Sequence, residues 1–218
     1  MSDDALTIDV VSDVVCPWCY LGEKRLEAAL AEEPEPVTVR WRPYQLDPTI
    51  PEGGLDRAEY MARKFGADGR LNAIHDNLTR LGAEVGLDFA FDRIRRAPNT
   101  LDAHRLVRWA ASADVQREVV DRLFKAYFTQ GRDIGDRAVL LEIAAQSGMD
   151  ASIVDKLLVE GADIDTVRRE IAEAQAIGVT GVPFFIFANR LAVPGAQDVA
   201  MLKRAIQQAR DAMNAPAG

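Results

Sequence analysis

The chain of 218 residues carries 34 acidic and 26 basic side chains and has a formal net charge of −8. Because binding to phosphate backbones requires clustered basic surface, this acidity argues against nucleic acid as a partner. Hydrophobic residues make up 48% of the chain, which is enough to bury a core and excludes a disordered protein. The length fits one large domain or a core domain that carries a sizeable insertion.

The chain contains no apolar stretch that would cross a membrane. Spanning a bilayer takes ~20 consecutive apolar residues, and no segment approaches that length. The first five residues, Met-Ser-Asp-Asp-Ala, lack the positively charged segment that opens a secretory signal. We therefore expect a cytoplasmic protein with no membrane partner, although a mature chain whose signal had been removed would look the same.

The first predicted unit, in chain order, is strand, helix, strand. Residues 6–12 are rich in β-branched types and predict a buried strand. Pro17 suits the first position of a helix, and apolar residues at helical spacing continue to Leu30. Residues 37–42 alternate apolar and polar and predict a second strand, which Pro43 ends. The two strands of a βαβ unit are parallel, and open α/β sheets place their chemistry at the carboxyl ends of such strands.

Helices dominate the middle of the chain, after a loop over residues 44–56. Apolar residues at helical spacing predict helices at residues 59–65, 71–85, 100–111, 119–128, 136–146, 152–159 and 165–177. The end of the chain changes character again. The apolar run 184–187 predicts a buried strand, 191–193 an antiparallel partner, and 198–213 a last helix before a frayed tail.

The two ends of the chain complement each other, and the helices lie between them. This order predicts an α/β fold in which one domain is interrupted by an all-helical insertion. The predicted α/β domain covers residues 1–45 and 175–218, and the predicted insertion covers residues 46–174.

The only two cysteines of the chain, Cys16 and Cys19, stand where the first strand passes into the first helix. Cysteines three apart at a helix start lie on one face of the first turn, close enough for a disulfide. Free backbone N–H groups and the positive end of the helix dipole stabilise a thiolate at Cys16, which makes it the attacking sulfur. Cys19, one turn further, is expected to be less exposed and to resolve the mixed disulfide. Between them, Pro17 and Trp18 are candidate substrate-binding residues.

Three other interpretations of the cysteine pair stay open. A zinc site would need two further ligands, and the only histidines, His75 and His104, show no finger-like spacing, so we expect no metal. The pair would otherwise form a structural disulfide in a secreted protein, or be two ordinary buried cysteines.

At this point the residues resemble a known family. Cys16 to Cys19 after a strand, with Gly181 to Pro183 before a late apolar strand, resembles the thioredoxin fold, and the helical block between them resembles DsbA-type oxidoreductases. Within these, the FrnE-like branch is similar to 2-hydroxychromene-2-carboxylate isomerases and kappa-class glutathione transferases. The segments that resemble this branch are Asp13 to Cys19, Pro98 to Thr100 with Ala103 to Arg105, Gly178 to Pro183 and Val193 to Gln197.

The resemblance implies that Pro183 is cis and packs against the cysteine motif, leaving the backbone of Val182 free to pair with an extended substrate. It also implies that Asn99 and His104 line a substrate cleft on the helical insertion; a helix cap and a packing histidine are their structural alternatives. In the isomerase and transferase relatives a serine typically stands at the position of Cys16. The cysteine here favours disulfide exchange over glutathione-dependent isomerisation.

The prediction is therefore a thioredoxin-fold thiol–disulfide oxidoreductase that exchanges disulfides with a protein or small-thiol substrate. Because the chain has no further cysteine to act as an internal relay, an external reductant must recharge the site. Two alternatives remain: a glutathione-dependent isomerase of a small aromatic or polyketide compound, and a holdase-like chaperone that uses apolar surface around Trp18 and Tyr20. We expect no cofactor, with glutathione left open as a co-substrate.

Overall fold

The computed structural model describes residues 5–66 and 69–215. Our expectations about a secretory signal and a frayed tail fall in part on residues 1–4 and 216–218, which lie outside the described residues. The first residue of the expected tail, Asn214, instead closes the last helix. Over the described ranges, no helix is both long and apolar enough to cross a membrane.

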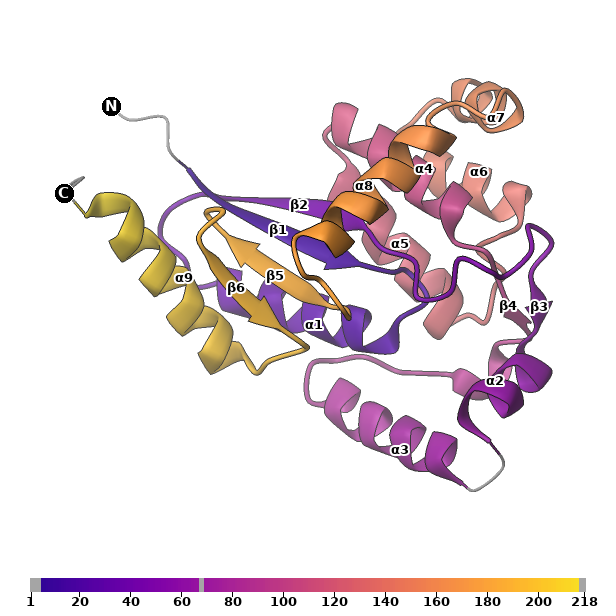
Figure 1. Ribbon diagram of the computed structural model, residues 1–218, viewed down its shortest axis with the longest axis horizontal. Helices are drawn as coiled ribbons and strands as arrows, with labels where there is room; N and C mark the ends of the chain where they lie inside the picture. Colours follow the sequence, from indigo (N-terminus) through magenta and orange to yellow (C-terminus); the bar gives the residue numbers. More distant parts are fainter. Residues whose placement is uncertain (1–4, 67–68, 216–218) are drawn as a thin grey trace.

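A four-stranded mixed sheet forms the α/β part of the molecule (Figure 1). Its strands, in the spatial order β2-β1-β5-β6, are β1 (Leu6–Ser12), β2 (Val37–Pro43), β5 (Phe184–Phe187) and β6 (Leu191–Pro194). β1 runs parallel to β2 and antiparallel to β5, and β5 runs antiparallel to β6. The register sets Val10 opposite Phe185 and Ile8 opposite Phe187, and all four side chains are buried. These strands confirm the predicted ones.

Two helices from opposite ends of the chain pack beside this sheet. They are α1 (Pro17–Leu30) and α9 (Val199–Asn214), which contact each other, and α9 also contacts β5 and β6. α1 buries an apolar stripe that includes Leu21, Leu26 and Ala29. Asp198 is the N-cap residue of α9, and its carboxylate accepts the N–H of Met201 at 2.7 Å.

The helical insertion lies at one end of the sheet (Figure 1). Its helices are α2 (Arg57–Phe65), α3 (Arg70–Ala83), α4 (Leu101–Ser112), α5 (Gln116–Phe128), α6 (Arg137–Gln146), α7 (Ala151–Val159) and α8 (Ile164–Ala176). α4, α5 and α8 contact the edge strand β2. The fold is thus the predicted thioredoxin type with a helical insertion, while the exact domain boundaries at residues 45 and 175 stay a prediction.

Three short elements in the insertion were not predicted. β3 (Leu55–Asp56) pairs antiparallel with β4 (Arg96–Ala97), and η1 (Phe91–Arg93) is a single 3₁₀ turn. Elements of two or three residues are too short to show a period in the sequence. Their pairing depends on the tertiary fold that brings residues 55 and 97 together.

Candidate active site

The two cysteines stand at the N-terminal end of α1. Cys16 is the N-cap residue, with extended backbone (φ −92°, ψ 113°), and Pro17 occupies the first turn. The N–H of Cys16 donates to the Asp13 carbonyl at 2.9 Å, and the N–H of Cys19 closes on the Cys16 carbonyl at 3.0 Å. No acidic side chain lies in the first turn of α1. The positive end of the helix dipole therefore faces the sulfurs without a carboxylate on that turn to offset it.

Both thiols are free and buried, with exposed fractions of 4% for Cys16 and 2% for Cys19. Burial raises the pKa of the Cys19 thiol well above its ordinary value, and the hydrogen bond and charge of Cys16 raise it further. The Ser12 side chain and the Asp13 backbone hydrogen-bond Cys19 and lower its pKa. Cys19 is the slightly less exposed cysteine, as expected, and desolvation favours its protonated form.

A second segment, far away in sequence, meets the cysteines. The Val182–Pro183 peptide bond is cis, as the family resemblance implied. The Cys16 thiol lies with its Sγ 3.6 Å from the Val182 carbonyl oxygen. Pro183 is held in turn by its carbonyl, which accepts the N–H of Gly195 at 2.8 Å. The N–H of Val182 has no hydrogen-bond partner among the described residues, so it remains available to a bound molecule.

Asp13 joins the cysteine loop to the helical insertion. Its carboxylate is 1% exposed, accepts the N–H of Leu46 at 2.8 Å, and lies 3.3 Å from Nε2 of His104 in α4. The same Nε2 lies 2.8 Å from the Tyr44 carbonyl oxygen. Because a carbonyl only accepts, Nε2 carries the proton that faces both oxygens. His104, 3% exposed, therefore makes the contacts of a packing histidine, and its role in binding substrate stays a prediction.

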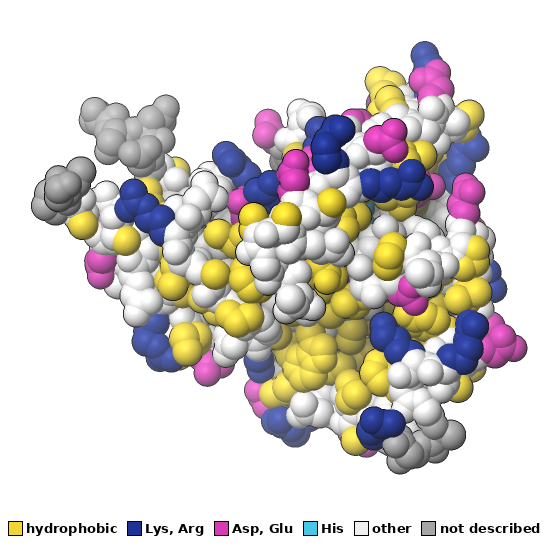
Figure 2. Space-filling model, viewed as in Figure 1, with side chains coloured by type: hydrophobic (Ala, Val, Ile, Leu, Met, Phe, Trp, Pro, Cys, Tyr) yellow, Lys and Arg dark blue, Asp and Glu magenta, His cyan; other side chains and the backbone are white. Residues whose placement is uncertain are grey.

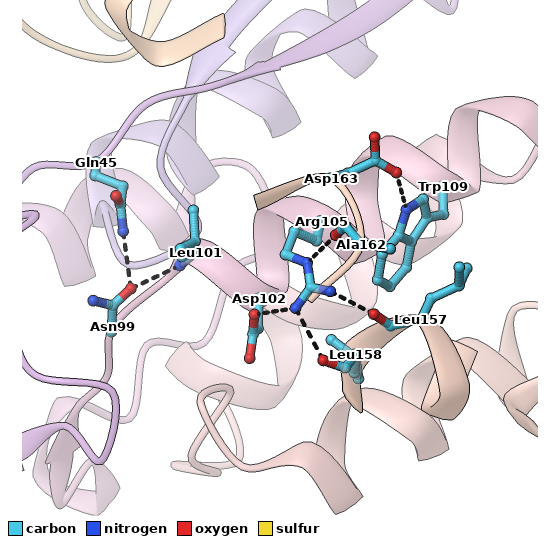
Figure 3. A network of polar contacts seen from close by, with 10 residues as sticks. All are labelled: Gln45, Asn99, Leu101, Asp102, Arg105, Trp109, Leu157, Leu158, Ala162 and Asp163. Atoms are coloured by element: carbon cyan, nitrogen blue, oxygen red, sulfur yellow. Dashed lines mark hydrogen bonds and ion pairs between the residues drawn. The ribbon is translucent and has the colours of Figure 1, made fainter. Parts of the chain in front are cut away.

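Asn99 fixes the start of α4 (Figure 3). Its Oδ1 accepts the N–H of Leu101 at 2.9 Å and the side-chain amide of Gln45 at 3.0 Å, and its Nδ2 donates to the Ile50 carbonyl at 2.6 Å. The N-cap residue of α4 is Thr100, which makes no side-chain cap hydrogen bond, so Asn99 is not the helix cap itself; its side chain binds the first N–H of the helix and ties the loop after β2 to the insertion. Binding of substrate by Asn99 stays a prediction as well.

Arg105, next to His104, organises the insertion from within (Figure 3). Its buried guanidinium donates to the carbonyls of Leu157 and Ala162, both at 2.6 Å, and to the Asp102 carboxylate at 2.7 Å. These carbonyls belong to the C-terminal end of α7 and the turn after it; the Leu157 carbonyl also accepts the N–H of Ala162 at 3.0 Å, whereas the Ala162 carbonyl has the guanidinium as its partner. Arg105 therefore fixes α7 to α4 and leaves no donor directed at the cysteines.

The residues beside the cysteines differ in how deeply they are buried. Pro17 and Trp18 are half-buried, so both keep some surface for a ligand. Tyr20 is buried in an aromatic cluster, with its ring stacked on Phe124 at 5.0 Å and edge-on to Phe89 at 5.9 Å between centroids. α1 is thereby anchored to α5 of the insertion one residue after Cys19.

A cavity of about 850 Å³ lies along the outer edge of β2, between that strand and α4, α5 and α8. His104 lines it, but neither cysteine does, nor do Asn99 and Val182. The structure thus brings together Cys16, Cys19, Val182 and Pro183 as predicted. It connects His104 to them only through Asp13, and it directs Asn99 to the loop after β2.

Three contact residues of the site were not among the predicted site residues: Ser12, Asp13 and Gly22. Ser12 ends β1, Asp13 follows it, and both contact Cys19. Gly22 packs against Pro183. Asp13 belongs to the segment that resembles the FrnE-like branch, and Gly22 carries a signal because a glycine inside a helical segment usually has a packing reason; Ser12 carries none.

A family model described as a DSBA-like thioredoxin domain matches residues 7–207. A probable DsbA oxidoreductase from Streptomyces coelicolor is 31% identical, with a TM-score of 0.88 over 98% of this chain and 93% of that one. Two structures share the fold at lower identity. A 2-hydroxychromene-2-carboxylate isomerase is 17% identical (TM-score 0.71, 96% and 99% covered), and the cytosolic disulfide reductase DsbM from Pseudomonas aeruginosa, solved with GSH, is 22% identical (TM-score 0.60, 95% and 96% covered).

The chain belongs to the DSBA-like thioredoxin-domain family and is a DsbA-like oxidoreductase. Its structural neighbours include the isomerase relatives that the FrnE-like resemblance implied.

Proposed function

We propose that the chain is a thiol–disulfide oxidoreductase in which Cys16 attacks a substrate disulfide and Cys19 resolves the product. One observation carries this proposal. The only two cysteines share the first turn of α1, and Sγ of Cys16 lies 3.6 Å from the carbonyl of Val182, whose N–H is unpaired among the described residues. A nucleophilic sulfur beside free backbone groups suits attack on a disulfide held in an extended chain.

The exchange has two steps. The Cys16 thiolate attacks one sulfur of the substrate disulfide, forms a mixed disulfide, and releases the other substrate sulfur as a thiolate, which takes up a proton. The Cys19 thiol then loses its proton and attacks Sγ of Cys16, which releases the second substrate thiol. The substrate gains two electrons and the chain is left with a Cys16–Cys19 disulfide. An external thiol or dithiol protein restores the reduced pair, and the same steps in reverse would oxidise a substrate dithiol.

The surface around α1 supports a polypeptide as the substrate. In Figure 2, apolar side chains gather on the face where α1 and α3 lie close together in Figure 1. Partly buried apolar residues of these elements and of the segment after α3 include Trp18, Ile74, Leu81 and Val85. Apolar surface of this kind fits the exposed core residues of an incompletely folded protein.

Glutathione is a second, smaller thiol for the same site. The similarity to DsbM, a structure solved with GSH, supports glutathione as a co-substrate or reductant, and that neighbour's cytosolic location supports a cytoplasmic site of action. The isomerase activity of another neighbour is less favoured, because the chain carries a second sulfur at Cys19 that isomerisation does not need.

Two matched variants, Cys16→Ser and Cys19→Ser, test the mechanism with a disulfide-bonded peptide and a dithiol reductant. Cys16→Ser is expected to abolish turnover. Cys19→Ser is expected to stop after the first step and to accumulate a mixed disulfide that intact-mass measurement shows as the protein plus one peptide. Turnover by Cys16→Ser, or trapping on Cys19 instead of Cys16, would contradict the assigned roles.

The variant that combines Cys16→Ser with Cys19→Ser tests the holdase alternative, and Cys19→Ser alone tests the isomerase alternative. If the double variant suppresses aggregation of an unfolding protein as well as the unchanged chain does, a holdase activity exists apart from the thiols. If Cys19→Ser binds glutathione stoichiometrically and isomerises an aromatic substrate, the isomerase alternative replaces the proposal.

A further inference from the structure

Gly22 occupies an unusual place for a glycine. It is buried in the interior of α1, one turn after Cys19. A glycine inside a helix costs about 1 kcal/mol relative to alanine, because it loses more backbone entropy on folding. The residues around it, Leu21 and Glu23 to Leu26, favour a helix without it. Something other than helix formation therefore accounts for the glycine.

The cause is a close approach between α1 and the segment that follows Val182. A Cβ placed on Gly22 would lie 3.0 Å from Cγ of Pro183 and 3.2 Å from Cζ of Phe185. Both distances are shorter than ordinary carbon–carbon contacts, so an alanine would force a movement of a few tenths of an ångström.

The two residues that would meet the new methyl group are fixed. Pro183 is a ring with its carbonyl bonded to the N–H of Gly195 at 2.8 Å. Phe185 is fully buried in β5, where it pairs with Val10 on one side and Val193 on the other. Because neither yields easily, α1 itself would have to move away from β5.

Such a movement would reach the attacking sulfur. Cys16 caps the same helix less than two turns before Gly22, and its Sγ is 3.6 Å from the residue that precedes Pro183. We propose that Gly22 is a positioning residue, which sets the distance between the Cys16 sulfur and the backbone of Val182. The inference rests on the proposed function, since it assumes that Cys16 attacks a disulfide whose chain pairs with Val182.

The role predicts a selective loss. A peptide disulfide must satisfy two constraints at once, the sulfur of Cys16 and the backbone groups of Val182. A small disulfide such as bis(2-hydroxyethyl) disulfide needs only the sulfur. Gly22→Ala is therefore expected to lower kcat/KM about tenfold for the peptide and less than twofold for the small disulfide, since small misplacements of reacting groups cost one to two orders of magnitude.

A double-mutant cycle with Pro183→Ala shows whether Gly22 acts through Pro183. Removing Cγ of Pro183 removes the closest contact of the added methyl group but leaves Cζ of Phe185 at 3.2 Å, so Gly22→Ala should lower the peptide rate only about threefold in that background, against about tenfold with Pro183 present. Gly53→Ala is the matched control, because a Cβ on Gly53 meets nothing within 4 Å. It should leave both rates unchanged.

Equal losses for both disulfides, no loss, or the same loss in the Pro183→Ala background would overturn the inference. If Gly22→Ala does not fold with Pro183 present, urea unfolding of Pro183→Ala with and without Gly22→Ala replaces the rates: a double variant that folds supports the contact with Pro183, and a double variant that also fails to fold overturns it. Cys16→Ser tests the proposed function separately, because its loss of turnover alongside a normal Gly22→Ala enzyme would refute only the positioning role.

Discussion

Glu23 is a buried acid on the redox helix, and its replacement by glutamine gives the sharpest test of the energetics of α1. The side chain is 4% exposed, and its Oε2 accepts no hydrogen bond among the described residues. Lys24 lies 4.0 Å away but is itself bonded to Glu27 and to Asp121. Burial is the main cause that raises the pKa of Glu23 from 4.5 to about 8, and the nearby ammonium of Lys24 lowers it only in part.

The sign of the effect follows from proton binding. Between pH 4.5 and 8 the folded state keeps the proton of Glu23 while the unfolded chain has released it, so the free energy of unfolding falls as the pH rises. At ~1.4 kcal/mol per pKa unit, the loss reaches ~3 kcal/mol at pH 7 and levels off near ~5 kcal/mol above pH 8. Both are upper values, because a charged carboxylate also draws water and rearranges its neighbours.

Glu23→Gln keeps the shape and removes the titration. The buried amide adds an unpaired donor, which lowers stability by a constant ~1 kcal/mol at every pH. The difference in unfolding free energy between the variant and the unchanged chain is therefore expected to grow by about 2–4 kcal/mol in favour of the variant from pH 5 to pH 8. Urea titrations at pH 5, 6, 7 and 8 with reductant present measure it.

Glu27→Gln is the control on the same helix. Glu27 is 45% exposed and pairs with Lys24 and Arg117, so its replacement should change stability by no more than ~0.5 kcal/mol. A Glu23→Gln difference that stays flat across this pH range would refute the reasoning, because it would mean that Glu23 ionises in the fold as readily as in the unfolded chain.

Three further predictions concern single side chains. Because burial raises the pKa of Cys19, the rate at which Cys19 resolves the mixed disulfide should rise steadily from pH 6 to pH 9 in quenched-flow measurements, and a flat profile would contradict the assignment. Arg105→Met should lower the free energy of unfolding by ~2 kcal/mol, because it leaves the carbonyl of Ala162 unpaired, while the Leu157 carbonyl keeps the N–H of Ala162 as a donor; a loss below ~1 kcal/mol would show that water replaces the guanidinium. Asp150→Ala should cost about 1 kcal/mol through loss of the N-cap of α7, while Asp150→Asn should restore most of it.

The fold was predictable because its elements are long and periodic. In α4 to α9 the apolar residues recur at the spacing of a helix, and β1 is a run of β-branched residues that is typical of a buried strand. β3 and β4 have two residues each, so no period exists to be read. The apolar stripe that predicts α5 begins at Val119, whereas the helix begins at Gln116. The Gln116 amide pairs with both the N–H and the carbonyl of Trp41 in β2, a tertiary contact that local sequence does not encode.

The site was predictable only in part, for the same reason. Cys16 and Cys19 are neighbours in sequence, and the family resemblance supplied Pro183. The partners of His104, Asp13 and the carbonyl of Tyr44, come from two segments that are distant from α4 in the sequence. Spacing alone does not distinguish a histidine that faces a cleft from one that faces a buried carboxylate.

α1 carries the attacking cysteine at its start and packs against two other parts of the chain, and this links the chemistry of the thiols to the stability of the whole chain. Its N-terminal turn carries Cys16, Gly22 packs against Pro183, and Tyr20 stacks on Phe124 of the insertion. Any contact that is stronger with reduced cysteines than with a disulfide stabilises the reduced state, and by a thermodynamic cycle it makes the pair a stronger oxidant by the same free energy. The reduced pair makes two such contacts, the Cys16 thiol with Val182 and the Cys19 thiol with the end of β1. A substitution that weakens the packing of α1 against Pro183 or Phe124 should therefore change both the reduction potential of the cysteine pair and the free energy of unfolding. The ratio of the two changes depends on how much the packing of α1 differs between the reduced and the disulfide state.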